Sequence, residues 1–341
     1  MVQEILQHYL HEFRAGREVA SVDSEPLFDA MITERDERPI SDVLAAWNKK
    51  GISEDELFEF ASIMRKRMRR IYPGHKNHVD MVGTGGSRAK TFNVSTAAAF
   101  VIAGAGTPVA KHGNRAATSN SGSSDVLALL GIEVDIDPKR SERHLNEYGL
   151  SFLFAPRFHS LSATLASARR SLGEPTIFNN LGPLCNPASA PHHIIGVAGV
   201  EQFERTANVL ARLGTERSWV VRGEDGLDEI SLAGMTQIAE VTGHQVERLE
   251  IGVEDFGLRA VSNTIPANCS ARESEQLIRG VLSNQISGGN AEKLVLINAA
   301  AALHVAGSGL DLRQSFELAE SSIRSGAAIA KLKILASETT K

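Results

Sequence analysis

The sequence predicts an α/β protein in which a small, all-helical N-terminal domain precedes a larger α/β domain with a mostly parallel central sheet. Three observations predict this fold class. Residues 1–72 carry apolar side chains at helical spacing only, from Val79 onward short apolar runs alternate with helical patterns, and a glycine cluster follows the first of these runs. Strands that alternate with helices are typical of parallel sheets, because the chain must cross back along a face of the sheet before it can add the next parallel strand.

The N-terminal domain is predicted to contain four helices. Apolar residues recur on one helical face in residues 2–13, and a second short stripe lies in residues 27–32. Ser41 is expected to cap a third helix. The segment Ser53–Glu56 has the spacing of a capping box and is predicted to open a fourth helix, which Pro73-Gly74 is expected to end.

The larger domain, residues 76–341, is predicted to follow a helical domain of residues 1–75. Its strands are expected at Val79–Val82, Pro108–Ala110, Phe152–Phe154, Ile194–Gly196, Ser218–Arg222 and Glu229–Leu232. Its helices are expected at Ser95–Ala105, Ser123–Leu130, Lys139–Tyr148, Leu161–Leu172, Glu201–Leu213, Ser274–Leu282 and Lys293–Ala306. The tail after Leu335 is expected to be frayed.

The stretch from Asp80 to Asp125 has the composition of a binding site for an anion. It contains the glycine cluster Gly83–Gly86, the polar turn Thr91–Thr96 and the polar loop Lys111–Asp125. Glycines allow the backbone N–H groups to approach a ligand, hydroxyls donate to phosphate oxygens, and a helix that begins near Ser95 points its positive end toward them. Because the carboxyl ends of parallel strands meet at one edge of the sheet, we expect these three turns to converge.

The glycine cluster alone has a plain structural alternative, a tight turn between a strand and a helix. It is not a P-loop, because no Gly-Lys-Ser/Thr follows Gly86 at the required spacing, and it lacks the third glycine of a dinucleotide-binding fingerprint. The coincidence of the three turns within one stretch favours the phosphate site over the plain turn.

Composition places the chain among globular proteins that have no general attraction to nucleic acid or membranes. The 341 residues are 42% hydrophobic and 23% charged, and the net charge is −5. The N-terminus lacks the pattern of a signal peptide, no apolar run reaches the ~20 residues of a membrane span, and two cysteines are typical of a reduced cytoplasmic protein. A basic cluster at Arg65–Arg70 is interpreted as a solvated helix face and not as a nucleic-acid patch, because no aromatic residues interleave with it.

Six motifs, in order along nearly the whole chain, resemble those of the anthranilate phosphoribosyltransferase family. They are GTGG from Gly83, TFNVST from Thr91, KHGNR from Lys111, SGSSD from Ser121, RRSLGEPTIFNNLGPLCNP from Arg169 and DGLDEIS from Asp225. The resemblance implies a nucleoside phosphorylase-like phosphoribosyltransferase fold. It also implies a homodimer, with residues 165–190 joining the helical domain in space and hinge strands near 76–82 and 186–193.

The resemblance further implies transfer of a 5-phosphoribosyl group from phosphoribosyl diphosphate to anthranilate in tryptophan biosynthesis, with two Mg²⁺ ions per subunit held by Ser95, Asp228 and Glu229. No side chain is assigned as a catalytic acid or base; Mg²⁺ and Lys111 are expected to stabilise the leaving group, and His112 is expected to have a structural role. The anthranilate site is expected at Gly83, Asn114 and Arg169. The phosphoribosyl diphosphate site is expected at Gly83, Gly86, Ser87, Thr91, Asn93, Ser95, Thr96, Lys111, Gly113, Asn114, Ser119 and Ser123.

The sequence departs from the family pattern at several positions. Ser87-Arg88 replaces the usual acid and glycine after GTGG, a change that could weaken metal binding or bring Arg88 to the diphosphate. Other departures are at Ser160, Ala166–Ala168, Cys185 and Arg222. They leave two alternatives, a phosphoribosyltransferase for another small aromatic acceptor and a relative that binds nucleic acid without catalysis. A pyrimidine nucleoside phosphorylase is disfavoured, because its nucleoside-binding motifs are not matched.

Overall fold

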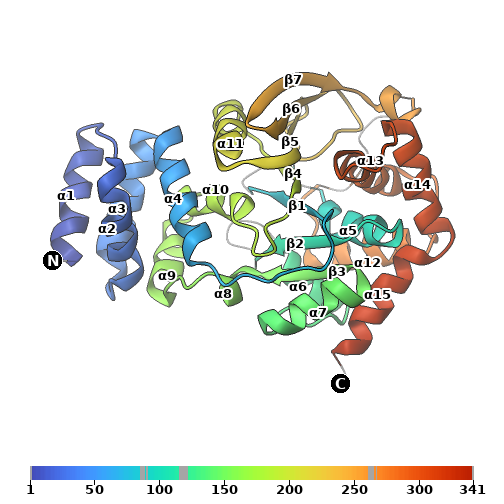
Figure 1. Cartoon of the computed structure of the whole chain (residues 1–341), viewed down its shortest axis with the longest axis horizontal. Helices are drawn as coiled ribbons and strands as arrows, with labels where there is room; N and C mark the ends of the chain where they lie inside the picture. The colour runs from blue at the N-terminus through green and yellow to red at the C-terminus, as the bar shows by residue number, and fades with distance from the viewer. Residues whose placement is uncertain are drawn as a thin grey trace.

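A seven-stranded sheet organises most of the chain in the computed structural model (Figure 1). The structure describes residues 2–84, 89, 91–114, 122–259, 265 and 267–339. The strand order is β3-β2-β1-β4-β5-β6-β7, with the neighbours among β1 to β5 parallel and with β6 and β7 antiparallel. The strands are β1 (Val79–Gly83), β2 (Val109–Gly113), β3 (Leu150–Phe154), β4 (His192–Gly196), β5 (Thr215–Gly223), β6 (Thr236–Gly243) and β7 (Gln245–Ile251).

The five parallel strands confirm five of the predicted strands, and the sixth prediction is wrong. The segment Glu229–Leu232 is irregular, because the N–H and the carbonyl of Ile230 both bond to the side-chain amide of Asn298 and not to a neighbouring strand (2.9 and 3.2 Å). The antiparallel hairpin β6–β7 was not predicted. Its outer strand β7 is mostly exposed and carries charged residues, so it lacks the apolar run that marks the buried strands.

Helices cover both faces of the sheet, and successive residues of each strand pack on opposite faces. On one face, Ile194 and Trp219 belong to a core that includes α5 (Val94–Gly104) and α13 (Asn290–Val305). On the other face, Ile195 and Val220 belong to a core that includes α11 (Val200–Leu213) and continues into the N-terminal helices. Because both faces of the sheet are covered, successive residues of a parallel strand are all buried, and the strands are almost continuous apolar runs in the sequence.

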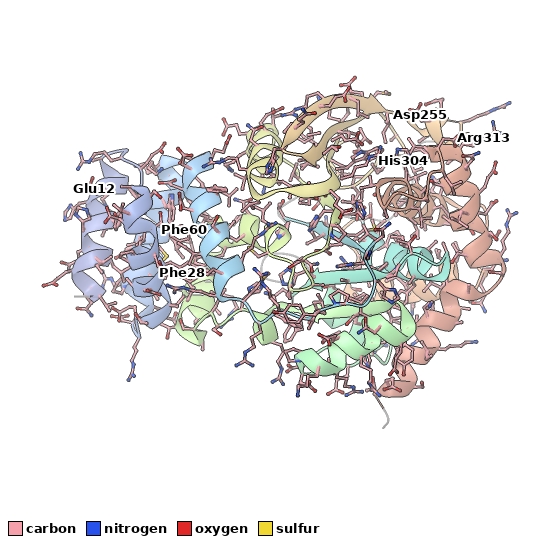
Figure 2. The ribbon with its side chains drawn as sticks, in the orientation of Figure 1. Glu12, Phe28, Phe60, Asp255, His304 and Arg313 are labelled. Carbon is pink, nitrogen blue, oxygen red and sulfur yellow. The ribbon has the colours of Figure 1, made fainter. Side chains whose placement is uncertain are left out.

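The N-terminal helices lie beside the sheet and not on it (Figure 1). They are α1 (Val2–Arg14), α2 (Ser21–Thr33), α3 (Glu37–Lys50) and α4 (Glu54–Arg67). The aromatic rings of Phe28 and Phe60 pack at 5.6 Å between α2 and α4 (Figure 2), and the ring of Phe178 from α10 (Ile177–Leu184) lies 6.3 Å from that of Phe28. A helix from the middle of the chain therefore packs into this bundle. The boundary at residue 75 stays a prediction.

Two of the predicted helix limits in this bundle are corrected. Asp36, not Ser41, caps α3, since its side chain accepts from the N–H of Arg38 (3.0 Å). The capping box of Ser53 is confirmed, but α4 ends at Arg67, before the predicted Pro73-Gly74. The buried carboxylate of Glu56 completes this box and also accepts from the Trp47 indole and the Lys50 ammonium (2.8 and 2.9 Å), which fixes α3 against α4.

The described chain is helical up to Glu338, where a frayed tail after Leu335 was expected. Helix α15 (Ala327–Glu338) ends with the buried carboxylate of Glu338, which accepts from Arg143 and Tyr148 on α7 (2.6 and 3.1 Å). Neither α14 (Leu312–Arg324) nor α15 was predicted. The other elements are α6 (Ser123–Leu129), α7 (Pro138–Tyr148), α8 (Ala155–Phe158), α9 (Ala163–Leu172), α12 (Ala271–Leu282) and the 3-10 turn η1 (Val253–Phe256).

Candidate active site

A cavity of about 930 Å³ opens at the carboxyl ends of the parallel strands. The last residues of β1, β2 and β4, which are Gly83, Gly113 and Gly196, all line it. Met64 of α4 and Phe178 of α10 line the same cavity from the helical bundle. The cavity therefore lies between the sheet and the bundle, at the sheet edge where the sequence predicts an anion site.

The expected binding residues that fall within the described ranges all line this one cavity. They are Gly83, Thr91, Asn93, Ser95, Thr96, Lys111, Gly113, Asn114, Ser123, Arg169, Asp228 and Glu229. Three more expected residues, Gly86, Ser87 and Ser119, lie outside the described residues, as does Arg88. The roles of the individual residues stay predictions.

Two hydroxyl groups at the N-terminal end of α5 line the cavity and have no partner in the part of the chain that the structure describes. The helix begins at Val94, and the Oγ1 atoms of Thr91 and Thr96 are both buried without a hydrogen bond among the described residues. A buried hydroxyl without a partner loses its hydrogen bond to water, so a ligand oxygen at this position would restore it. These two hydroxyls and the positive end of the helix suit an anion.

The acidic pair Asp228 and Glu229 is held against the ends of β1 and β4 by close backbone packing. A Cβ atom on Gly83 would lie 2.9 Å from the Oδ2 atom of Asp228, and a Cβ atom on Gly196 would lie 1.8 Å from the carbonyl oxygen of Asp228. The bonds from Asn298 to Ile230 fix the residue that follows the pair. The glycines at these strand ends therefore make room for the acidic segment.

Lys111 is a buried lysine at the cavity wall that interacts electrostatically with the two acids Asp80 and Glu229. Its side chain donates to the carbonyl oxygen of Met81, and only 4% of the residue is exposed. Burial lowers the pKa of the Lys111 ammonium, and the charges of Asp80 and Glu229 act in the opposite direction.

Asp80 is fully buried and connects three segments. Its carboxylate accepts from the backbone N–H of His112 on β2 (3.0 Å) and from the side chain of Asn186 (2.7 Å), which precedes β4. Burial raises the pKa of Asp80 to about 6, while Lys111 and these hydrogen bonds oppose the shift. Asp80 therefore ties β1 and β2 to the segment that returns from the helical bundle.

His112 contacts two other segments of the chain, and its structural role stays a prediction. Its Nδ1–H donates to the carbonyl of Gly182 on α10 (2.9 Å), and its Nε2 atom lies 3.2 Å from the Nε2 atom of His159. Burial lowers the pKa of His112 to about 4 and that of His159 to about 3, so both rings are neutral at neutral pH. The two histidines connect β2 to α8 and α10, and both line the cavity.

Arg169 of α9 provides the cation on the bundle side of the cavity. Its Nη2–H donates to the side-chain oxygen of Asn179 (3.2 Å), and its guanidinium carbon lies 5.2 Å from the ring centre of Phe178. Its Nε atom is buried without a partner among the described residues. Burial and, to a lesser extent, the charge of Arg170 lower the pKa of Arg169 to about 10, so the guanidinium stays cationic at neutral pH.

The residues present fit a magnesium ion that shares its coordination with a substrate. Within the described ranges, no group of three or more His, Cys, Asp or Glu residues could hold a metal by protein ligands alone. Mg²⁺ prefers oxygen ligands and is commonly bound by one or two carboxylates together with substrate phosphates. The hydroxyl of Ser95 and the carboxylates of Asp228 and Glu229, all at the cavity wall, are donors of this kind.

Sequence reasoning missed several residues on the bundle side of the cavity. The cavity is also lined by His159, Phe178 and Asn179. These residues come from the end of α8 and from α10, and no local sequence pattern shows that these helices pack beside the cavity. Of the departures from the family pattern, Ala166 lies at the cavity wall, whereas the buried Cys185 and the side chain of Arg222 do not line it.

The basic cluster, interpreted from the sequence as a solvated helix face, is only partly solvated, because Arg65 is half-buried and Arg67 is exposed. Arg65 donates to the carbonyls of Leu184 and Leu213 (2.6 and 3.5 Å). Arg67 pairs with Glu25 and Asp29 on α2. Two of its cations therefore already have internal partners.

Comparison with known proteins agrees with this geometry. The chain matches the family model described as the glycosyl transferase family, a/b domain, over residues 75–329. It is 42% identical over 332 residues to the anthranilate phosphoribosyltransferase of Moorella thermoacetica, with 97% of each chain covered. None of the helices in the described part of the chain is long and apolar enough to cross a membrane.

Solved structures of the same enzyme from other organisms superpose on nearly the whole chain. The anthranilate phosphoribosyltransferase of Thermus thermophilus is 32% identical, with a TM-score of 0.86 and 98% of this chain and 99% of that chain covered. The Saccharomyces cerevisiae enzyme, in complex with phosphoribosyl diphosphate and Mg, is 26% identical, with a TM-score of 0.87 and 98% of each chain covered. The chain thus has the fold predicted for it, and it belongs to the anthranilate phosphoribosyltransferase family.

Proposed function

We propose that the chain catalyses the Mg²⁺-dependent transfer of the 5-phosphoribosyl group from phosphoribosyl diphosphate to anthranilate, which gives N-(5-phosphoribosyl)anthranilate and diphosphate. The product belongs to tryptophan biosynthesis. One observation carries the proposal: a single cavity of about 930 Å³ has anion-binding groups on its sheet side and a cation beside an aromatic ring on its bundle side. These two sides suit a phosphorylated donor and a small aromatic acid.

The sheet side would bind the donor. Thr91 and Thr96 offer buried hydroxyls to diphosphate oxygens, and Lys111 offers a buried cation to the negative charge that develops as the diphosphate leaves. The backbone of Gly113 and the hydroxyl of Ser123 approach each other closely, since a Cβ atom on Gly113 would lie 2.6 Å from the Ser123 Oγ atom.

The bundle side would bind the acceptor. Arg169 offers its guanidinium to the carboxylate of anthranilate, and the ring of Phe178 lies beside that guanidinium. The amine of anthranilate would then face the donor from the opposite side of the cavity. His112 and His159 are neutral and paired with each other, and an aromatic amine needs no prior deprotonation before it attacks.

Magnesium would neutralise the diphosphate when bound, held by Ser95, Asp228 and Glu229. The two carboxylates are adjacent in the chain and line the cavity together with the N-terminus of α5. We propose two ions per subunit, because two adjacent carboxylates and a diphosphate can share two cations. Counting the ions bound per chain by calorimetry in the presence of the donor tests this number.

We also propose that the protein is a homodimer that acts in the cytoplasm. The resemblance of the chain to its family supports the dimer. The two cysteines, Cys185 and Cys269, are both buried and form no disulfide, which suits a reducing compartment. Light scattering of the purified protein tests the oligomeric state.

The test of the reaction is the loss of anthranilate fluorescence on mixing the purified protein with anthranilate, phosphoribosyl diphosphate and Mg²⁺. We expect a loss that EDTA prevents, with one diphosphate released for each anthranilate consumed. Magnesium-dependent donor binding without loss of fluorescence would indicate a different acceptor. The absence of both turnover and donor binding would overturn the proposed function.

A further inference from the structure

We infer that Asn179 is a positioning residue that gives the acceptor side of the cavity its preference for a carboxylate. It holds the Arg169 guanidinium through a neutral oxygen, so that the positive charge remains for the substrate. The inference rests on the proposed function, because it concerns how the same cavity recognises its acceptor.

The Asn179 side chain joins Arg169 to the start of the neighbouring helix. Its Oδ1 atom accepts from Nη2–H of Arg169 (3.2 Å), from the backbone N–H of Thr176 (3.0 Å) and, at longer range, from the Thr176 hydroxyl (3.4 Å). The bond to the Thr176 N–H is half of the capping box of α10. The position of Asn179 Oδ1 is therefore set by the helix cap, and it in turn sets one edge of the guanidinium.

Phe178 restricts the second direction of movement. Its ring centre lies 5.2 Å from the guanidinium carbon of Arg169, and the ring is buried in the core of the helical bundle. An aromatic ring attracts a guanidinium without neutralising it. One hydrogen bond along an edge and one ring against a face fix the orientation of Arg169 and leave its charge intact.

Arg169 has no protein carboxylate to pair with among the described residues. No ion pair within 4.0 Å involves it there, whereas Arg67 has two such pairs and Arg140 has one. Its Nε–H is buried and has no acceptor in the described part of the chain. A half-buried cation that is fixed in place, charged and incompletely bonded at the wall of a cavity suits an incoming carboxylate.

The neutrality of residue 179 is the feature that distinguishes this arrangement. An aspartate there would accept the same hydrogen bonds from Arg169 and Thr176, and a negative charge is favourable in the first turn of a helix. It would, however, form an ion pair with Arg169 and compete with the acceptor for the guanidinium. A purely structural role of Asn179 would tolerate this substitution, and a role in acceptor recognition would not.

The experiment compares Asn179→Asp with the wild type for two acceptors, anthranilate and 2-aminobenzamide, in which a neutral amide replaces the carboxylate. We expect the anthranilate KM to rise roughly 10- to 100-fold, because this factor corresponds to the loss of one charge-assisted hydrogen bond. The donor KM should stay unchanged. The ratio of kcat/KM for anthranilate over 2-aminobenzamide should fall by a similar factor. The matched control is Asn180→Asp, one residue further along α10, whose side chain bonds to Gln202 outside the cavity.

Thermal unfolding confirms that the variants fold, and calorimetry gives the anthranilate dissociation constant independently of turnover. A folded Asn179→Asp protein with an unchanged anthranilate KM, dissociation constant and acceptor ratio would overturn the inference and leave the proposed function standing. A wild type that binds anthranilate without converting it, and that loses this binding in Asn179→Asp, would support the inference and overturn the proposed reaction. A wild type that neither binds nor converts anthranilate would overturn both.

Discussion

The carbonyl oxygen of Asp228 occupies the space where a side chain on Gly196 would begin. A Cβ atom built on Gly196 would lie 1.8 Å from that oxygen, far closer than any nonbonded contact allows. We predict that Gly196→Ala displaces the acidic segment from the end of β4. Because a shift of about 1 Å at a reacting site can lower the rate by roughly 100-fold, kcat should fall by about this factor. Steady-state turnover at saturating donor, acceptor and Mg²⁺ measures it.

The control for this substitution is Gly199→Ala, three residues further along the chain. There the added Cβ atom would lie 3.7 Å from the Cβ atom of Gln202, which is an ordinary contact. Gly199→Ala should therefore retain most of the activity. Wild-type kcat in a folded Gly196→Ala protein would show that the position of Asp228 is not needed for turnover.

Glu229→Gln is predicted to remove Mg²⁺-dependent turnover while the protein stays folded. The substitution keeps the size of the side chain and removes one of the two adjacent carboxylates at the cavity wall. Since a bound metal ion contributes several kcal/mol to the stabilisation of a transition state, the rate at a fixed Mg²⁺ concentration should fall by about 100-fold or more. The measurement is the rate as a function of Mg²⁺ concentration, with circular dichroism as the check on folding.

Glu224→Gln is the matched control, because Glu224 lies in the same connection between β5 and β6. Its carboxylate accepts from the backbone N–H of Met235 (3.0 Å) and does not line the cavity. Its rate should stay near that of the wild type at every Mg²⁺ concentration. Full activity of Glu229→Gln would remove Glu229 from the metal site.

Lys111→Ala is predicted to weaken the binding of the donor and not that of the acceptor. Lys111 lies on β2 beside the donor side of the cavity, so its loss should raise the KM of phosphoribosyl diphosphate by the equivalent of about 1.5–3 kcal/mol. Lys331→Ala removes a half-buried lysine that donates to the carbonyl of Tyr148 away from the cavity, and it should leave both KM values unchanged. An effect of Lys111→Ala on the anthranilate KM alone would contradict the placement.

The parallel part of the sheet could be predicted from the sequence, because buried strands leave apolar runs between helices. The segment at Glu229–Leu232 has a similar run, yet its backbone bonds to Asn298, a residue of α13 that is distant in sequence. The opposite error concerns β7, whose charged residues face solvent. Local patterns report burial, and they fail where a tertiary contact replaces strand pairing or where a strand lies at the sheet edge.

The sheet side of the site could also be predicted, since the rule that parallel strands end at one edge brings Gly83 and Lys111 together. Arg169 needed the family resemblance, because its helix α9 belongs to the other side of the cavity and an arginine near a helix end usually faces solvent. Asn179 lies within the motif that begins at Arg169, but nothing in that motif marks it as a partner of Arg169. Its contact with Arg169 depends on how α9 and α10 pack, which no spacing along the chain records.

His193 is predicted to make the protein less stable in mild acid. It lies on β4 and is 2% exposed, its Nδ1 atom pairs with the Ser218 hydroxyl (3.2 Å), and burial followed by nearby positive charges lowers its pKa to about 3. In the unfolded chain the ring protonates near pH 6.5, whereas in the folded protein it stays neutral, so the unfolded state binds more protons between about pH 6.5 and 3. The contribution of His193 to the free energy of unfolding is therefore complete above pH 6.5 and falls as the pH drops through this window.

The size of this acid effect follows from the same two pKa values. At pH 5 His193 alone should lower the free energy of unfolding by about 2 kcal/mol relative to pH 7.5. Urea titrations at both pH values measure the difference, which should shrink by that amount in His193→Asn. The full difference between the two pH values should persist in the control variant His8→Asn, because His8 is at an exposed position on α1. An unchanged difference in His193→Asn would mean that His193 does not cause the acid sensitivity.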